Sequence, residues 1–235
     1  SRRFFHTKHL VRPNIIELRD VRFAEGDLRD YIRTLGLGDL FNPPVVQLLH
    51  LFQEAKNFGS LVQPCLDGQS IASVRLTIEK KDLSGQESLL KTHLKILRVL
   101  DQAEALTQRY HVVVANPPYM GSNKFNGSLA DFTAASFPEG KSDLYSCFML
   151  RTLGIIVPGG YCAMITLPNW MFLGSFEELR FRLLHNNFFS GLIHNGRGLW
   201  GPDFGSCAFI LESGARPNSL TFSKRLFDKI GRAHV

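Results

Sequence analysis

The sequence predicts an α/β protein with a doubly wound sheet, in which a mainly helical region precedes the residues that form the sheet. Residues 111–115 (HVVVA) form a nearly continuous β-branched run, which is typical of a parallel strand covered on both faces. A helical pattern at residues 143–157 and a second apolar run at residues 161–167 follow, and together they make one β-α-β unit.

The composition is that of a globular protein. With 235 residues, 44% of them hydrophobic and 20% charged, the chain can bury one large core or two small ones. Its apolar runs fall short of the ~20 residues of a membrane helix, so we expect a soluble, cytoplasmic protein without a membrane partner. A net charge of +6 fits a polyanionic partner without requiring one. The cysteines form no C-x-x-C pair, so we expect no metal and no disulfide framework.

The N-terminal part of the chain is predicted to be mainly helical. We expect a short strand at residues 21–23 and then a helix that Asp27 caps and that runs to Leu35. Pro43 or Pro44 at a first helical position predicts a second helix, because proline is preorganised for that position.

A longer helix is predicted at residues 87–108. Apolar side chains recur there at helical spacing, and lysine and arginine side chains fall on the opposite face. The preceding residues 60–84 have no clean period, although a helix fits there. The apolar face of the longer helix is expected to consist of Leu89, Leu90, Leu94, Ile96, Leu97, Leu100 and Ala103.

Beyond the β-α-β unit, the pattern predicts one more helix and two more strands. The Pro-Gly-Gly stretch at residues 158–160 is expected to stop the helix before the strand at residues 161–167 begins. Ser175 and Glu178 match a capping box that would start a helix through His185. The further strands are expected at residues 188–195 and 207–212, joined by the glycine-rich stretch 196–205.

The sequence Asn116-Pro117-Pro118-Tyr119, called the NPPY tetrad below, directly follows the predicted strand at residues 111–115. Doubly wound sheets bind ligands beyond the carboxyl ends of their strands, so the tetrad lies where a binding site is expected. Asn-Pro-Pro alone can be merely a rigid turn. Its place at the end of a buried strand favours a catalytic role for all four residues.

The residue types of the tetrad suit methyl transfer to a planar amine such as the exocyclic amine of adenine. The lone pair of that amine is delocalised into the ring, so it must be localised before it can attack a methyl group. The Asn116 side-chain oxygen and the Pro117 carbonyl can each accept one N–H hydrogen bond, which favours a tetrahedral nitrogen. Proline fixes its own φ, so the direction of that carbonyl is set in advance.

Two more residues suit a DNA substrate. An adenine inside a duplex must be extruded before it can react, and the Tyr119 ring can hold the extruded base by stacking, which is worth ~1–3 kcal/mol. Lys124 lies in the polar loop after the tetrad, where its cation can contact the DNA backbone, with an ordinary surface loop as the alternative. The side-chain amide of glutamine poses the same chemical problem, so a protein glutamine N5-methyltransferase is an alternative function.

From Tyr110 onward the sequence resembles the γ-ordered amino-methyltransferases, and in particular the adenine-specific PglX methyltransferases of BREX phage-defence systems. Shorter upstream stretches at residues 20–23, 57–64 and 81–85 are similar to the same family, so the resemblance covers nearly the whole chain. The main matching stretches are residues 111–120 (HVVVANPPYM), 141–148 (KSDLYSCF), 163–176 (AMITLPNWMFLGSF) and 204–211 (FGSCAFIL).

The resemblance implies an incomplete Rossmann-like S-adenosylmethionine-dependent methyltransferase sheet with a helical insertion before the NPPY strand. It also implies a site-specific DNA N6-adenine methyltransferase that uses S-adenosyl-L-methionine, with double-stranded DNA and other BREX proteins as partners. Asp143 and Leu144 match the family's motif beside the cofactor, with a helix cap as the alternative role for Asp143. Phe204 falls where the family often places a second aromatic against the flipped base, although a core position is the alternative in a chain with 19 phenylalanines.

The family's glycine-rich cofactor loop has no match before residue 110. We therefore expect a fragment of a longer enzyme that alone neither binds the cofactor well nor acts. Alternatives to the BREX enzyme are a type IIG restriction-modification methyltransferase and a non-enzymatic DNA-binding subunit. The expected parts are a mainly helical insertion or linking region at residues 1–109, the C-terminal half of the catalytic domain at residues 110–229, and a non-native tail at residues 230–235 that resembles a translated sequencing adapter.

Overall fold

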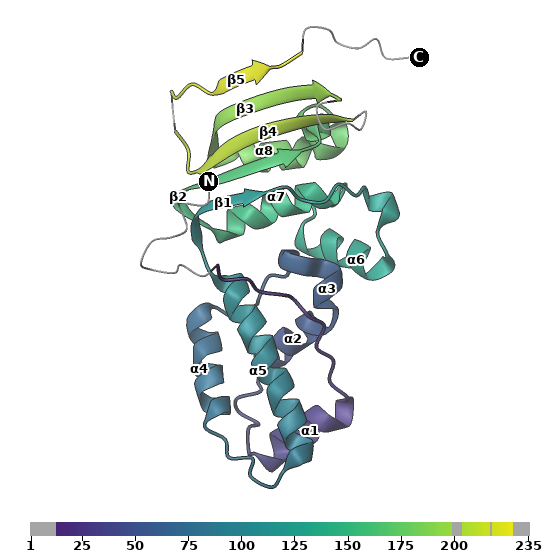
Figure 1. The fold of residues 1–235 in the computed structure, drawn as a ribbon, viewed down its shortest axis with the longest axis vertical. Coiled ribbons are helices and arrows are strands. Elements are labelled where there is room, and N and C mark those ends of the chain that lie inside the picture. The colour runs from purple at the N-terminus through teal and green to yellow at the C-terminus, as the bar shows by residue number, and fades with distance from the viewer. Residues whose placement is uncertain (1–12, 199–203, 217, 228–235) are drawn as a thin grey trace, which may run out of the picture. The chain divides into compact units, whose positions relative to one another are not determined.

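The computed structural model describes residues 13–198, 204–216 and 218–227 of the chain, and Figure 1 shows it as a ribbon. The chain divides into two compact units, Ser1–Thr107 and Gln108–Val235, each with its own hydrophobic core. The predicted tail at residues 230–235 lies outside the described residues. Within the described ranges, none of the helices combines the length and the apolar character that a membrane span requires.

The N-terminal unit is helical, as predicted. Its α-helices are α1 (Glu25–Thr34), α2 (Pro43–Leu51), α3 (Ala55–Phe58), α4 (Gly68–Glu79) and α5 (Glu87–Thr107), and its 3-10 helices are η2 (Phe52–Glu54) and η3 (Gly59–Leu61). The Asn42 side chain caps α2 by accepting from the Val45 N–H, and the first helical positions hold proline as expected. Helix α4 lies where the sequence has no clean period, and Asp67 caps it by accepting from the Ser70 N–H at 2.7 Å.

Two predictions for the start of this unit are wrong. Residues 21–23 form no strand, because the described part of the N-terminal unit contains no strand with which they could pair. Val21 instead donates a backbone hydrogen bond to the Phe52 carbonyl at 2.9 Å. Helix α1 begins at Glu25 rather than after Asp27, and Ala24 at its N-cap makes no side-chain hydrogen bond.

Helix α5 confirms the predicted long helix, but its buried face is rotated from the predicted one. Leu100 is fully buried as expected, whereas Leu90 and Leu94 are 43% and 55% exposed. His93 is buried on this helix, where its Nδ1 lies 2.8 Å from the hydroxyl of Tyr31 on α1. The spacing of apolar residues does not predict the burial of a polar side chain such as that of His93, because its burial depends on a hydrogen-bond partner on another helix.

The C-terminal unit is built on a five-stranded sheet with the strand order β1-β2-β4-β3-β5. Its strands are β1 (Tyr110–Ala115), β2 (Ile156–Thr166), β3 (Asn187–Arg197), β4 (Gly205–Ser213) and β5 (Phe222–Arg225). Strands β1 and β2 are parallel, as the predicted β-α-β unit requires, and β4 runs antiparallel to both β2 and β3. The predicted α/β class with an incomplete sheet is confirmed, while β5 lies outside the predicted elements.

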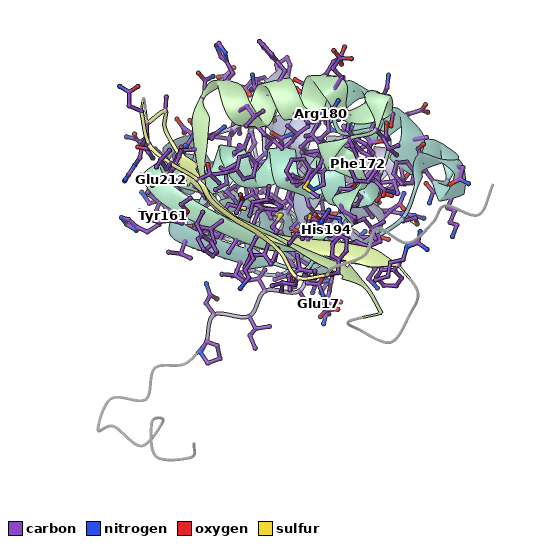
Figure 2. The ribbon with its side chains drawn as sticks, turned by 90° about the horizontal axis from the view of Figure 1, so that it is seen from above. Glu17, Tyr161, Phe172, Arg180, His194 and Glu212 are labelled. Carbon is purple, nitrogen blue, oxygen red and sulfur yellow. The ribbon has the colours of Figure 1, made fainter. Side chains whose placement is uncertain are left out.

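The helices of this unit cover one face of the sheet (Figure 2). Met149 of α7 and Leu179 of α8 share one core with Met164 of β2 and Phe209 of β4. The connecting elements are the α-helices α6 (Gly127–Ser136), α7 (Leu144–Ile155) and α8 (Glu177–His185), with the 3-10 helices η4 (Ser122–Lys124), η5 (Pro168–Met171) and η6 (Gly174–Phe176).

Strand β1 is not covered on both faces in the described part of the chain, so that expectation is wrong. Val112 and Val114 are 58% and 76% exposed, although their β-branched side chains are typical of a buried parallel strand. The next residues along the strand, Val113 and Ala115, pack partly against the core under α7 and α8. One face of the sheet is therefore packed, and the opposite face is open at β1.

Two further boundaries differ from the prediction. The Pro-Gly-Gly stretch at residues 158–160 lies inside β2 rather than before it, in a stretch where the register with β1 shifts. Gly159 has a φ of +74°, a value that glycine adopts readily, and the shift resembles a bulge. Phe176 is the N-cap of α8 and makes no side-chain bond, so the capping box of Ser175 and Glu178 is wrong.

The buried pair of Tyr31 and His93 gives a test of the N-terminal unit. Burial lowers the pKa of His93 below its usual 6.5, so the unfolded chain binds a proton more readily than the folded one. Stability is therefore expected to fall as the pH drops below 6.5. Tyr31→Phe leaves the buried ring nitrogen unpaired and should lower the free energy of unfolding by about 1 kcal/mol.

Urea unfolding followed by circular dichroism between pH 7.5 and pH 5.5 (about two units around the usual histidine pKa) measures both effects. Tyr110→Phe is the matched control, because the Tyr110 hydroxyl donates to Gln108 at 3.2 Å in an exposed position. Equal losses for the two variants would contradict the role given to the buried pair.

Candidate functional site

The NPPY tetrad continues directly from the carboxyl end of β1, and its last residue, Tyr119, packs against the core beneath the sheet. Asn116 and Pro118 are exposed, Pro117 is buried and Tyr119 is half-buried. The buried proline fixes the turn, while the amide of Asn116 stays accessible to a ligand. The tetrad thus occupies the edge of the sheet at which the sequence predicts a binding site.

Tyr119 is hydrogen-bonded to the residue that begins the tetrad. Its hydroxyl lies 3.1 Å from Asn116 Oδ1 and 3.2 Å from the backbone carbonyl oxygen of Ile165 on β2. The single hydroxyl proton serves these two acceptors, so Asn116 Oδ1 keeps a lone pair for another donor. Burial raises the pKa of Tyr119, so the hydroxyl stays protonated at neutral pH and remains a donor.

Aromatic rings hold the Tyr119 ring on two sides. Tyr145, which is fully buried on α7, meets it edge to face with the ring centroids 6.1 Å apart. Phe204 meets it at 6.0 Å with an angle of 85° between the ring planes. The structure therefore brings Phe204 to Tyr119, and Phe204 must turn before a base can lie between two parallel rings.

Asp143 fastens the chain after the tetrad to the start of α7. Its Oδ1 accepts from the Met120 N–H at 3.1 Å and from the Tyr145 N–H at 3.3 Å. The Leu144 N–H donates to the Met120 carbonyl at 2.9 Å, and Gly121 forms an antiparallel bridge with Asp143. These bonds make Asp143 the N-cap of α7 and at the same time an anchor for the tetrad loop.

The partly buried position of Asp143 changes the pKa of its carboxyl group. Burial raises the pKa of its carboxyl group, and the hydrogen bonds from the Tyr145, Met120 and Leu144 N–H groups oppose the rise. The carboxylate is partly withdrawn from water, so the N–H groups are its main stabilising partners. Leu144, the other residue assigned to the cofactor, is 9% exposed.

Gly140, which no pattern in the sequence singles out, lets the chain approach α7 closely. A Cβ atom at Gly140 would lie 2.9 Å from the Ser146 carbonyl oxygen, so a larger residue would push the chain away. The Gly140 carbonyl accepts from the Ser146 hydroxyl at 2.5 Å, which ties the approaching loop to the helix. Its only sequence signal is a glycine shortly before the Asp143 cap.

Lys124 lies in η4, on the loop that follows the tetrad, and is exposed. The loop is held near α7 because the Ser122 N–H donates to the Ser142 carbonyl at 3.1 Å. The structure thus places a cation on a loop anchored beside the tetrad. Its contact with DNA stays a prediction.

A hollow of about 500 Å³ opens on the uncovered face of the sheet, beside Asn116. Asn116 and Ser190 carry the polar side chains among the described residues that line it, and the others are apolar or glycine. S-adenosyl-L-methionine needs charged or polar partners for its amino, carboxylate and hydroxyl groups. The hollow suits an apolar or aromatic group, but these residues do not fit the whole cofactor.

No group of three or more histidine, cysteine, aspartate or glutamate side chains that could hold a metal ion occurs among the described residues. The cysteines of the C-terminal unit, Cys147, Cys162 and Cys207, are buried and free. Burial raises the pKa of Cys162 to about 12, so its thiol is protonated at neutral pH. These three cysteines are part of the packing, whereas Cys65 of the N-terminal unit is exposed, so the expectation that every cysteine is a small buried hydrophobe is wrong for Cys65.

Comparison with known proteins places the chain in a family. Residues 47–198 match the family described as Eco57I restriction-modification methylase, a range that includes the tetrad, Asp143 and β2. The chain belongs to the Eco57I restriction-modification methylase family. The match covers more than half of the chain and includes residues of both compact units.

Curated relatives confirm the resemblance to the PglX methyltransferases. The adenine-specific methyltransferase BrxX of Escherichia coli O9:H4 (strain HS) is 29% identical over 94% of this chain, and the adenine-specific methyltransferase PglX of Lacticaseibacillus casei (strain Zhang) is 32% identical over 78%. The chain spans 20% of the length of the first relative and 15% of the second. It therefore corresponds to a small part of these longer proteins.

A solved structure of a class I S-adenosylmethionine-dependent methyltransferase from Listeria monocytogenes is also similar. The match covers 86% of this chain and 72% of the other, with 14% identity and a TM-score of 0.43.

The double role of Asp143 gives a test. Asp143→Ala removes a helix cap and also frees the Met120 N–H, so it should lower the free energy of unfolding by about 2 kcal/mol. Asn42→Ala removes the cap of α2, where Asn42 accepts from the Val45 N–H at 3.3 Å, and should cost about 1 kcal/mol. Chemical denaturation compares the two, and equal losses would contradict an anchoring role beyond capping.

Proposed function

We propose that the chain is part of a longer site-specific DNA N6-adenine methyltransferase, which transfers a methyl group from S-adenosyl-L-methionine to a flipped adenine in BREX phage defence. The observation that carries the proposal is the accessible Asn116 Oδ1 at the end of β1, hydrogen-bonded to the Tyr119 hydroxyl at 3.1 Å. The names of both curated relatives, adenine-specific methyltransferases, support the same substrate.

In this proposal the tetrad binds and activates the target amine. Asn116 Oδ1 accepts one N–H of the amine, and the Pro117 carbonyl accepts the other. Two acceptors on one nitrogen draw it toward a tetrahedral shape, so its lone pair leaves the ring system and points at the methyl donor. Pro118 limits the conformations of the turn, which keeps the two acceptors aligned.

Aromatic and charged groups hold the substrate. Tyr119 offers its ring to the extruded adenine, and Phe204 contacts the base after turning from its edge-to-face position. Lys124 binds a phosphate of double-stranded DNA from the loop after the tetrad. Other BREX proteins are the proposed partners in the cytoplasm.

S-adenosyl-L-methionine, when bound, supplies an electrophilic methyl group on a sulfonium centre. Asp143 and Leu144 are the proposed contacts to it from this chain, with Asp143 using the carboxylate oxygen that does not bind Met120. The apolar hollow beside Asn116 offers no carboxylate or cation among its described residues. We therefore assign most of the cofactor's polar partners to the remaining length of the enzyme.

Asn116→Ala in the full-length protein removes one of the two acceptors for the target amine. Methylation should fall by at least about 100-fold, because a preorganised hydrogen-bond partner of the reacting group is lost. DNA binding should change little, since the phosphate and stacking contacts remain. Transfer of radiolabelled methyl groups and a gel-shift assay measure the two quantities.

Asn123→Ala is the matched control, because Asn123 is exposed in η4 on the loop that follows the tetrad. An equal loss of DNA binding and methylation in Asn116→Ala would contradict the assigned role. The same assay should offer a protein release factor beside DNA, because methylation of glutamine alone would support the protein glutamine N5-methyltransferase instead.

The isolated chain should bind S-adenosyl-L-methionine more weakly than about 1 mM, a free energy of about −4 kcal/mol, because its described hollow lacks charged partners. Isothermal titration of the chain and of the full-length protein measures the difference. Micromolar binding by the isolated chain would show that its own residues complete a cofactor site.

A further inference from the structure

We propose that Phe172 inserts into the base stack of duplex DNA next to the extruded adenine and thereby holds that adenine out of the helix. This inference rests on the proposed function and adds a DNA-contacting residue outside the tetrad. Phe172 is 61% exposed and its neighbour Leu173 is 44% exposed, although both are large apolar side chains.

The position of Phe172 follows from the direction of the strands. It lies in the connection between β2 and α8, after the last residue of β2, Thr166. Because β1 and β2 are parallel neighbours, their carboxyl ends share one edge of the sheet. Phe172 therefore lies on the same edge as the NPPY tetrad.

The connection that carries Phe172 is fixed in place. Arg180 of α8 donates to the Trp170 carbonyl at 2.9 Å and to the Leu173 carbonyl at 2.7 Å, on both sides of Phe172. Phe172 and Arg180 lie close together in Figure 2. Trp170 itself is buried and stacks on Phe189 with the ring centroids 5.7 Å apart. An exposed aromatic ring on a fixed loop is ready to bind without losing much conformational freedom.

Hydrogen bonds connect this loop to the one that follows the tetrad. The Ser142 hydroxyl donates to the Ser175 carbonyl at 3.3 Å, and the Ser142 carbonyl accepts from the Ser122 N–H at 3.1 Å. Lys141 precedes Ser142 in the sequence and Lys124 follows Ser122 by two residues, and both lysines are exposed. Cations on segments that are hydrogen-bonded to the connection carrying an exposed aromatic ring suit the phosphates near an opened base step.

The Phe172 ring inserted between bases, called the wedge below, fills the gap that the extruded adenine leaves in the base stack. The Tyr119 ring can hold an adenine that has already left the duplex, but the gap in the base stack remains and favours its return. Proteins that distort DNA commonly insert phenylalanine or leucine between bases. A ring that stacks on the neighbouring base pair fills the gap and shifts the equilibrium toward the extruded state.

The test compares paired and unpaired targets. In the full-length protein, Phe172→Ala should lower kcat/KM about tenfold on a fully paired duplex, as expected for the loss of one stacking ring. It should match the parent when the target adenine lies opposite an abasic site, because extrusion then needs little help. Asn116→Ala should lose methylation to the same extent on both substrates, because it lacks the acceptor for the amine while Phe172 is still present.

Fluorescence of 2-aminopurine at the target position measures extrusion without methyl transfer, so it tests the wedge even if the proposed reaction fails. Phe172→Ala should reduce the signal on the paired duplex, whereas Phe181→Ala, at a 69% exposed position on α8, should leave it unchanged. An unchanged signal for Phe172→Ala, or equal losses of kcat/KM on the two substrates, would overturn the proposal. Matching unfolding curves for both variants exclude a loss of fold.

Discussion

The carboxylate of Asp143 is the contact on which the geometry of the site depends. It binds the N–H that follows the tetrad and the N–H in the first turn of α7, so one side chain fixes the tetrad loop to a helix of the core. The tetrad itself has two prolines and therefore few backbone donors with which to anchor itself. Without the Asp143 carboxylate as acceptor for the Met120 N–H, the two prolines would still stiffen the loop, but this hydrogen bond would no longer hold the loop in position relative to the sheet.

The residues around Asp143 also position the side chains that are proposed to hold the substrate. Tyr145 follows the Asp143 cap and presses its buried ring against Tyr119, so the cap also places the aromatic platform. Tyr119 in turn reaches back to Asn116 and to Ile165 on β2. A chain of contacts thus runs from the start of α7 to the acceptor oxygen, and each member is positioned by the one before it.

The sequence was a good guide where a local pattern decides the structure. The strand at the tetrad, the helix that Asp143 begins and the long helix α5 follow from apolar periods and caps that neighbouring residues set. The sequence was a poor guide where a partner distant in the sequence decides the structure. His93 is buried because it pairs with Tyr31, and the strand predicted at residues 21–23 has no neighbouring strand among the described residues of its unit. The rings of Phe204 and Tyr119 meet only through the fold, which no spacing in the sequence indicates.

The tetrad also explains why an acceptor-rich edge forms at the end of β1. A parallel strand normally continues to donate N–H groups to its neighbour, but Pro117 and Pro118 have none. The Tyr119 hydroxyl supplies a proton to the Ile165 carbonyl in their place, and it shares that proton with Asn116 Oδ1. Two acceptors, Asn116 Oδ1 and the Ile165 carbonyl, therefore share the one hydroxyl proton of Tyr119. A ligand N–H that donates to Asn116 Oδ1 would relieve this imbalance, and this is the physical argument for the proposed amine substrate.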